Sequence, residues 1–210
     1  MEIAFLITAF TALFVVIDPI GLAPLFVALT HGDGFRRRLQ IGLRACGVAF
    51  GLLTIFGLFG DVLLAGIGIS MPAFRIAGGI LLFLTALDML FERRTRRRQG
   101  QAQEDDPDSD PSVFPLAMPL IAGPGAMATM VLLAGAPDAD WQSILAVHLM
   151  MLAVLILVFV LFLSAGLLER VLGQTGIMVV TRLLGMLLAA LSVQFVLDGL
   201  LQSGMLPVAG

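Results

Sequence analysis

Charged residues, cysteine and histidine are scarce in this 210-residue chain. Only 13% of the residues are charged, there is one cysteine, there are two histidines, and tyrosine and lysine are absent. The low charge excludes an ordinary soluble domain, and a single cysteine excludes an internal disulfide framework. Apolar residues instead make up 59% of the chain, and the mean hydropathy is +1.04. These values predict an all-α polytopic membrane protein.

The few residues that often carry catalytic chemistry are not arranged for it. His31, His148 and Cys46 are far apart in the sequence, and no spacing resembles a metal site or a nucleophile beside its base. We therefore expect no enzyme activity, no metal site and no organic cofactor. Cys46 lies in an apolar run and is interpreted as a small buried side chain.

Long apolar runs divide the chain into six predicted membrane-spanning helices. A spanning helix needs roughly 20 mostly apolar residues, because the hydrocarbon core is about 30 Å thick. Ser70 ahead of Pro72 predicts the start of the third segment. Asp140 and Gly176 predict the starts of the fifth and sixth. The N-terminal "MEIAFLITAF" lacks the basic region of a signal peptide, so we expect it to be retained in the first segment. The segments are 3–30, 39–64, 71–91, 113–136, 142–168 and 177–202.

The distribution of arginine predicts the orientation. Ten of the twelve basic residues lie within 36–44, within 93–98 and at Arg170, after segments one, three and five. The positive-inside rule makes these loops cytoplasmic, which places both termini in the periplasm and the protein in a bacterial inner membrane. In one alternative, segments one and four are re-entrant hairpins. Only four spans then remain and Arg170 moves outside, so the arginine distribution favours six spans.

A polar stretch separates two halves of the membrane domain, residues 1–91 and 113–210. Residues 92–112, "ERRTRRRQGQAQEDDPDSDPS", form a basic run followed by an acidic run rich in proline and small polar residues. This composition cannot bury apolar surface, so it predicts a disordered cytoplasmic linker. A lipid-binding role for its arginines is an alternative, although topology alone explains them.

The two halves resemble one another. "AFRIAGGILLFLTAL" (73–87) aligns with "VTRLLGMLLAALSVQ" (180–194) at an offset of 107 residues, so that Arg75 matches Arg182. "DPIG" (18–21) aligns with "GPGA" (123–126) at the nearly equal offset of 105. Because each unit holds three segments, an odd number, the copies enter the membrane from opposite sides. The sequence thus predicts two inverted-topology three-helix repeats, an architecture typical of secondary transporters.

Both repeats carry helix breakers in the middle of their first segment, at Asp18-Pro19 and at Gly123-Pro124-Gly125. Proline removes an amide donor, and glycine admits conformations that other residues resist. Backbone groups freed in lipid cost several kcal/mol unless protein or water satisfies them. We therefore expect the two broken helices to share a cavity near the midplane; simple proline kinks are the alternative.

Broken helices of this kind predict a binding site for a small zwitterion. The half-helix after each break presents the positive end of its dipole to the midplane, which suits a substrate carboxylate. Asp18 is expected to bind a cationic amino group, a proton or a sodium ion, or to be protonated or bonded to a neighbouring helix. The predicted carboxylate donors are the backbone amides around Gly21, Leu22, Gly125 and Ala126.

Two arginines and a threonine complete the candidate residues. Arg75 and Arg182 lie one to two turns inside segments three and six. Each is expected either to snorkel to the nearer interface, or to brace a broken helix through freed carbonyls, or to gate the cavity by pairing with Asp18. Thr129 is expected to supply a hydrogen bond to the substrate or to a neighbouring helix.

Three motifs in order, "IDPIGLAPLF", "AFRIAGGILLF" and "PLIAGPGAMAT", resemble the MarC/SnatA family of bacterial and archaeal inner-membrane proteins. The resemblance covers nearly the whole chain except the linker. It implies a six-span protein, some of whose relatives look like transporters of glycine, alanine and similar neutral amino acids. It also implies that the centre of the protein is formed by Asp18, Pro19, Gly21, Pro24, Gly123, Pro124 and Gly125.

The function expected from these features is secondary transport of small neutral amino acids or related metabolites by alternating access. A channel or passive pore with the same cavity, and a membrane scaffold without transport activity, are the alternatives. The expected partners are the lipid bilayer and a neutral amino acid, and no nucleic acid. The sequence leaves open the coupling ion (proton or sodium), the direction of transport, and whether the chain forms a homo-oligomer.

Overall fold

The computed structural model describes residues 3–93, 111–135 and 140–204, and these ranges contain helices and no strand. The all-α prediction is confirmed. Most of the predicted linker, residues 94–110, lies outside the described ranges. The elements are α1 (Ile3–Ile17), α2 (Pro19–Leu29), α3 (Phe35–Gly66), α4 (Met71–Leu90), η1 (Ser112–Ile121), α6 (Pro124–Ala134), α7 (Trp141–Leu163) and α8 (Ala165–Gln202).

Five stretches of helix are long and apolar enough to cross a membrane. A sixth span results if η1 and α6, which are bent by 56° relative to one another, are taken together. The helices α1 and α2 together pass the same test as one stretch of 27 residues, Ile3–Leu29. By length and composition the first segment is therefore a candidate for one span, and the bent pair η1 and α6 is either a broken span or a re-entrant loop.

Two of the three predicted helix starts, those at Ser70 and Asp140, are capped by the predicted residue. The Ser70 hydroxyl accepts from the amide of Ala73, and the Asp140 carboxylate accepts from the amide of Ser143. Each bond satisfies an amide that has no partner within its helix. The predicted start at Gly176 is wrong: α8 begins at Ala165 and is interrupted at Gly173, whose φ of 61° favours glycine.

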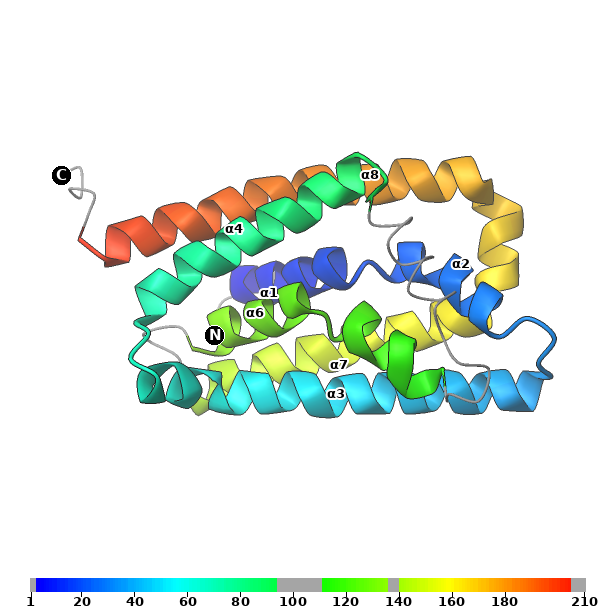
Figure 1. The fold of residues 1–210 in the computed structure, drawn as a ribbon, viewed down its shortest axis with the longest axis horizontal. Helices are drawn as coiled ribbons and strands as arrows, with labels where there is room; N and C mark the ends of the chain where they lie inside the picture. Colours follow the sequence, from blue (N-terminus) through cyan, green and yellow to red (C-terminus); the bar gives the residue numbers. More distant parts are fainter. Residues whose placement is uncertain (1–2, 94–110, 136–139, 205–210) are drawn as a thin grey trace.

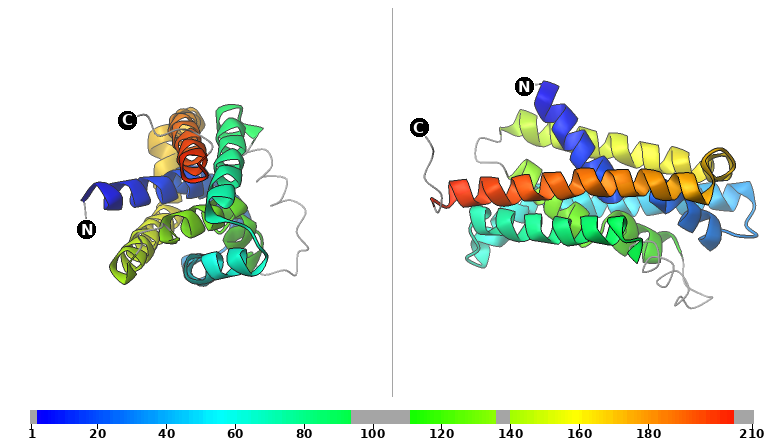
Figure 2. Two further views of the ribbon diagram at one scale, coloured as in Figure 1. Left: turned by 90° about the vertical axis from the view of Figure 1, so that its left-hand side faces the viewer. Right: turned by 90° about the horizontal axis from the view of Figure 1, so that it is seen from above.

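The helices form three layers, and α1 and α6, which adjoin the two predicted interruptions, occupy the middle one (Figure 1). The pair α4 and α8 lies on one side, and α3 and α7 lie on the other, with α1 and α6 between them. The end-on view in Figure 2 shows the same arrangement. In agreement with it, α1 contacts α6, α7 and α8, and α6 contacts α3, α4 and α7. The middle layer is therefore enclosed by protein on both sides.

Glycines let α4 and α8 approach to backbone contact. A Cβ atom on Gly79 would lie 2.8 Å from the carbonyl oxygen of Ser192, and one on Gly199 would lie 3.0 Å from that of Pro72. Small residues allow such approach between membrane helices, where van der Waals packing replaces the hydrophobic driving force. The pair α4–α8 is accordingly the most extensively packed in the described chain.

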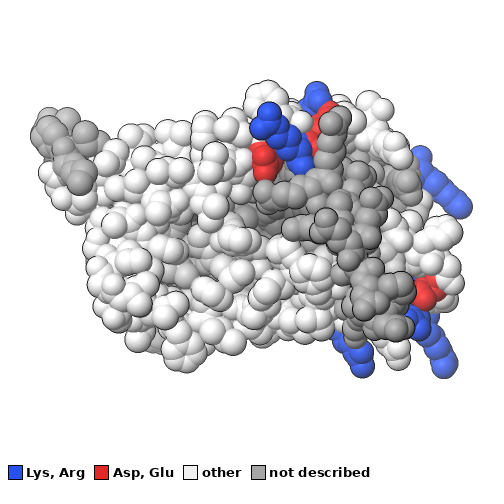
Figure 3. Space-filling model, viewed as in Figure 1, with Lys and Arg blue, Asp and Glu red and all other residues white. Residues whose placement is uncertain are grey.

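Arginines gather at one end of the bundle. The connections from α2 to α3 and from α7 to α8 lie at the right-hand end in Figure 1. The connection from α3 to α4, the end of α6 and the start of α7 lie at the left. On the face drawn in Figure 3, the basic side chains lie over the right-hand half. The helices thus alternate in direction, with the charge on the side that the sequence predicts to be cytoplasmic.

Candidate functional site

Asp18 separates α1 from α2 and caps α2. The residue is only 1% exposed and adopts the left-handed conformation, with φ 57° and ψ 65°. Its Oδ1 atom accepts a hydrogen bond of 3.1 Å from the amide of Gly21. Aspartate tolerates this backbone conformation better than most residues do, and its carboxylate favours the positive end of a helix. A negative residue is thereby held in the interior at the start of α2.

The cap by Asp18 requires glycine at position 21, because a larger residue would collide with the Asp18 carboxylate. A Cβ atom at position 21 would lie 2.2 Å from Oδ2 of Asp18 and 2.8 Å from its Cγ. The structure also changes the predicted donor set. The amide of Gly21 donates to the Asp18 side chain, and the amide of Leu22 donates to the Asp18 carbonyl oxygen at 3.1 Å. Neither is directed to a ligand here.

Two prolines of α2 follow Asp18 and alter the backbone hydrogen bonding around it. Pro19 begins α2, where its missing N–H costs little, and Pro24 lies inside the same helix. Each proline withdraws the amide that would meet the carbonyl four residues earlier, at Val15 and Ile20 respectively. The first segment therefore has altered backbone bonding over two turns around Asp18.

The start of α6 differs from the start of α2 because no side chain caps it. Gly123 is the N-terminal flanking residue, Pro124 is the first helical residue, and no side-chain hydrogen bond to the cap is found in the described chain. A Cβ atom on Gly123 would lie 2.6 Å from the carbonyl oxygen of Pro119, so this close turn requires glycine. The amides of Gly125 and Ala126 lie in the first turn, where a helix offers no internal acceptor. They remain candidates for an anionic ligand.

The two interruptions are neighbours in space. A Cβ atom on Gly125 would lie 3.3 Å from Cγ1 of Val16, two residues before Asp18, and 3.3 Å from Cδ2 of Leu82 on α4. Thr129, one turn into α6, is fully buried, and its hydroxyl donates to the Gly125 carbonyl oxygen at 2.8 Å. Thr129 thus satisfies its own helix, and only its oxygen lone pairs remain for other partners.

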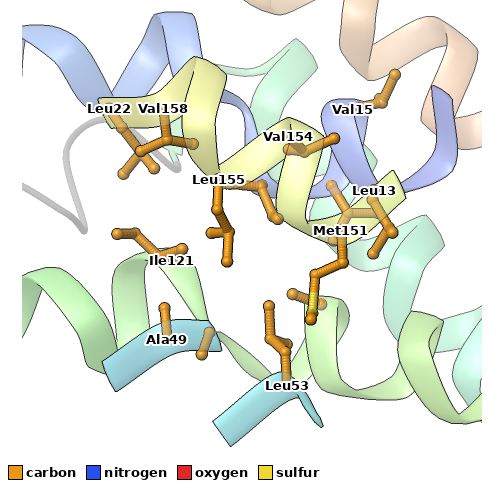
Figure 4. Packing of buried hydrophobic residues seen from close by; sticks show 14 of the residues in the cluster. Leu13, Val15, Leu22, Ala49, Leu53, Ile121, Met151, Val154, Leu155 and Val158 are labelled. Carbon is orange, nitrogen blue, oxygen red and sulfur yellow. The ribbon is translucent and has the colours of Figure 1, made fainter. Parts of the chain in front are cut away.

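Apolar side chains fill the interior beside the candidate site (Figure 4). Leu22 lies next to Val158 of α7, and Ile121, just before the second interruption, faces Leu155. All four are at most 4% exposed. The protein is therefore closed at this level, and a ligand would reach the site only after these side chains separate.

Arg75 is buried on α4 and does not pair with Asp18. The residue is 7% exposed, and its Nε is buried without an acceptor in the described chain. It lies seven residues before Leu82, which corresponds to about 10 Å along the helix. The predicted pairing with Asp18 is not formed among the described residues, and snorkelling of the terminal nitrogens stays a prediction.

Arg182 has a different partner from those predicted. Its guanidinium forms an ion pair with Glu92, just beyond the C-terminus of α4, and half of its side chain is exposed. Among the described residues, no bond of this arginine to a carbonyl at the two predicted interruptions or to Asp18 is found. The arginine joins the end of α4 to α8 instead.

His148 is a polar residue of the interior that the sequence-based site did not include. Its Nδ1 lies 2.7 Å from the carbonyl oxygen of Ile144. Its Nε2 is buried without a partner among the described residues, 2.9 Å from where a Cβ atom on Gly57 would lie. The sequence could have pointed to this residue, because a histidine is unusual in the most apolar of the candidate spans, which has a mean hydropathy of 3.1.

The described residues contain no group of three or more histidine, cysteine or carboxylate side chains able to hold a metal ion. A sodium ion at Asp18 would therefore have to take its other ligands from backbone carbonyls, hydroxyls or water, which are ordinary ligands for hard cations. The same carboxylate could instead receive a proton or a substrate ammonium group.

Comparison with known proteins finds similarity along almost the entire chain. Residues 3–203 match the family described as "MarC family integral membrane protein". A UPF0056 membrane protein of Archaeoglobus fulgidus is 38% identical, with 94% of this chain and 93% of the relative covered. One from Aquifex aeolicus is 36% identical (92% and 91% covered), and YvbG of Bacillus subtilis is 34% identical (99% of both). No solved structure matches.

Proposed function

Because the chain belongs to the MarC family of integral membrane proteins, we propose that it is a secondary transporter of small neutral amino acids or related metabolites. One observation carries the proposal. A buried aspartate caps one interrupted helix, and the uncapped start of a second interrupted helix adjoins it through Val16 and Gly125. A negative side chain and a positive helix end lie close together in the protein interior, and this arrangement matches the two charges of an amino acid zwitterion.

The proposed substrate binds in one orientation. Its ammonium group lies against Asp18, whose cap on Gly21 holds the carboxylate in place. Its carboxylate accepts from the first-turn amides of α6, at Gly125 and Ala126, where the helix dipole favours negative charge. The neighbouring side chains Leu82 and Val16 are apolar and leave little room, which favours glycine, alanine or serine over larger substrates.

The inverted repeat rests on the alignment of the two halves in the sequence, at offsets of 107 and 105 residues. The contacts of Gly185 with Met89 and of Gly79 with Val196 are compatible with a two-fold axis between α4 and α8. Antiparallel packing of the two helices produces both contacts by itself, so they add no separate support. An inverted repeat of this kind suits alternating access around a central site.

We place the protein in the bacterial inner membrane with both termini in the periplasm. The arginines at the end of the bundle that holds the α2–α3 and α7–α8 connections favour this orientation. Access from either side requires Leu22, Ile121 and their partners on α7 to separate, so the closed packing corresponds to an occluded state.

The test is ligand-induced thermal stabilisation of the purified protein in detergent. Glycine, alanine and serine are expected to raise Tm, with or without sodium and at several pH values. Asp18→Asn removes the charge and keeps a residue that caps helices and tolerates the left-handed conformation, so it is expected to fold and lose the response. Asp61→Asn, at an exposed position on α3, is the matched control. No stabilisation by any amino acid, or an unchanged response in Asp18→Asn, contradicts the proposal.

Transport itself is tested in proteoliposomes. A carrier gives saturable uptake and accelerated exchange when unlabelled alanine is present on the far side. A passive pore gives uptake without exchange, and a scaffold gives neither. Coupling to protons or sodium would appear as concentrative uptake driven by the corresponding gradient.

A further inference from the structure

Arg75 is a buried cation on the inner face of α4. Gly78, three residues later, faces Leu132 of α6, since a Cβ atom there would lie 3.0 Å from Leu132 Cδ1. Gly79, four residues later, faces Ser192 and Val196 of α8. Residues three and four apart flank one another on a helix, so Arg75 points into the wedge between α6 and α8.

The position of Arg75 is aligned with the candidate substrate site. Leu82, seven residues later on the same face of α4, lies against Gly125 at the start of α6. Helical side chains lean toward the N-terminus of their helix, so the guanidinium extends from about 10 Å away toward the end where α4 begins. The arginine thus lies between the site and that end of the bundle.

The alignment of the two halves of the sequence suggests which kind of group would pair with Arg75. Arg182, its counterpart at an offset of 107 residues, pairs with Glu92. The position related to Glu92 by the same offset is Gly199, which lies against Ile76 and Pro72, two residues of α4 close to Arg75 in the sequence. Gly199 has no carboxylate, so it cannot supply the counter-charge that Glu92 supplies to Arg182. A buried guanidinium nitrogen without an acceptor, as Nε of Arg75 is among the described residues, is costly, whereas an exposed one is not.

We propose that Arg75 binds the carboxylate of a small solute at a second position on the pathway, on the side where α4 begins. The proposal rests on the proposed function for the identity of the solute as an amino acid. The ligand supplies the carboxylate that Glu92 supplies to Arg182, and it moves from Arg75 to the start of α6 when the wedge between α6 and α8 opens. Arg75 would then be the first binding position for the anionic group.

The test uses acetate, alanine and alaninamide as probes in thermal-shift titrations, with chloride at equal ionic strength. Acetate and alanine are expected to stabilise the wild-type protein and alaninamide is not. Arg75→Gln is expected to weaken both responses by about tenfold or more, as for a lost charge-assisted hydrogen bond. Arg75→Lys is expected to restore part of them. Arg182→Gln, which removes a half-exposed arginine, is the matched control and is expected to stay within about twofold of wild type.

Two further arms separate the outcomes. Asp18→Asn should keep the acetate response and lose the alanine response, so failure of the amino acid site leaves the acetate measurement intact. Equal acetate titrations in wild type and Arg75→Lys or Arg75→Gln overturn the role of Arg75. An Arg75-dependent stabilisation by phosphatidylglycerol but not by acetate also overturns it, because a lipid phosphate would then be the anion. If Arg75→Gln is not recovered as a folded protein by gel filtration, the wild-type and Arg75→Lys titrations decide.

Discussion

Replacing Gly21 by alanine tests whether the cap by Asp18 organises the site. The added Cβ would lie 2.2 Å from Oδ2 of Asp18, far inside van der Waals contact, so the carboxylate must leave its present position. Losing the cap removes a hydrogen bond from a buried carboxylate, which costs roughly 1.5–3 kcal/mol. Alanine returns at most about 1 kcal/mol through its higher helix propensity.

The expected net effect of Gly21→Ala is therefore a loss of about 0.5–2 kcal/mol in the free energy of unfolding, which is the cost of the lost hydrogen bond less the gain in helix propensity. The measurement is an unfolding titration with SDS in detergent micelles, together with the alanine-induced rise in Tm. Gly47→Ala is the control, because no atom lies within 4 Å of a Cβ at that exposed position of α3. It should be neutral or slightly stabilising. If Gly21→Ala is as stable as Gly47→Ala and still responds to alanine, the cap does not organise the site.

Two other predictions concern the cap of α7 and the pair α4–α8. The hydrogen bonds from Ser143 lower the pKa of Asp140 below its usual value of 3.8. This cap therefore stabilises the protein above that pH and loses its effect as pH falls through the lowered pKa. Asp140→Asn keeps a capping side chain without the titration, so the acid-dependent part of the unfolding free energy should shrink; an unchanged pH profile contradicts this. Gly79→Ala places a Cβ atom 2.8 Å from the Ser192 carbonyl oxygen and should lower the free energy of unfolding by about 1–3 kcal/mol in the same SDS titration. Gly166→Ala is the control, because its position has open space around it, and it should not lower that free energy. Equal stabilities of the two variants would refute the backbone contact.

Local signals were sufficient for most helices and for the interruptions at Asp18 and before Pro124, but not for the one at Gly173. The length of a membrane span depends on the hydrocarbon thickness, so apolar runs predict it without knowledge of the neighbouring helices. The end of α1 at Ile17 and the start of α6 at Pro124 follow from proline and glycine chemistry, which acts within one helical turn. The prediction of a helix start at Gly176 was wrong because nothing in the local sequence distinguishes Gly176 from Gly173, three residues earlier, where α8 is interrupted.

The partners of individual side chains were not predictable in the same way. The sequence treated the starts of α2 and α6 as equivalent, but Asp18 occupies the amide of Gly21 whereas nothing in the described chain caps α6. It also treated Arg75 and Arg182 as equivalent. In the structure Arg75 is buried, whereas Arg182 is half exposed and pairs with Glu92.

The sequence by itself determined that this is an all-helical membrane protein with helix-breaking residues at matching places in two halves. These properties depend on composition and on contacts within a few residues, and both can be read along the chain. Only the tertiary structure decided that the interruptions meet through Val16 and Gly125, that Arg75 is enclosed between α6 and α8, and that Arg182 is tied to the end of α4. Those outcomes depend on which faces of distant helices pack together, and small residues such as Gly79 and Gly125 control that packing by allowing close approach at only a few positions.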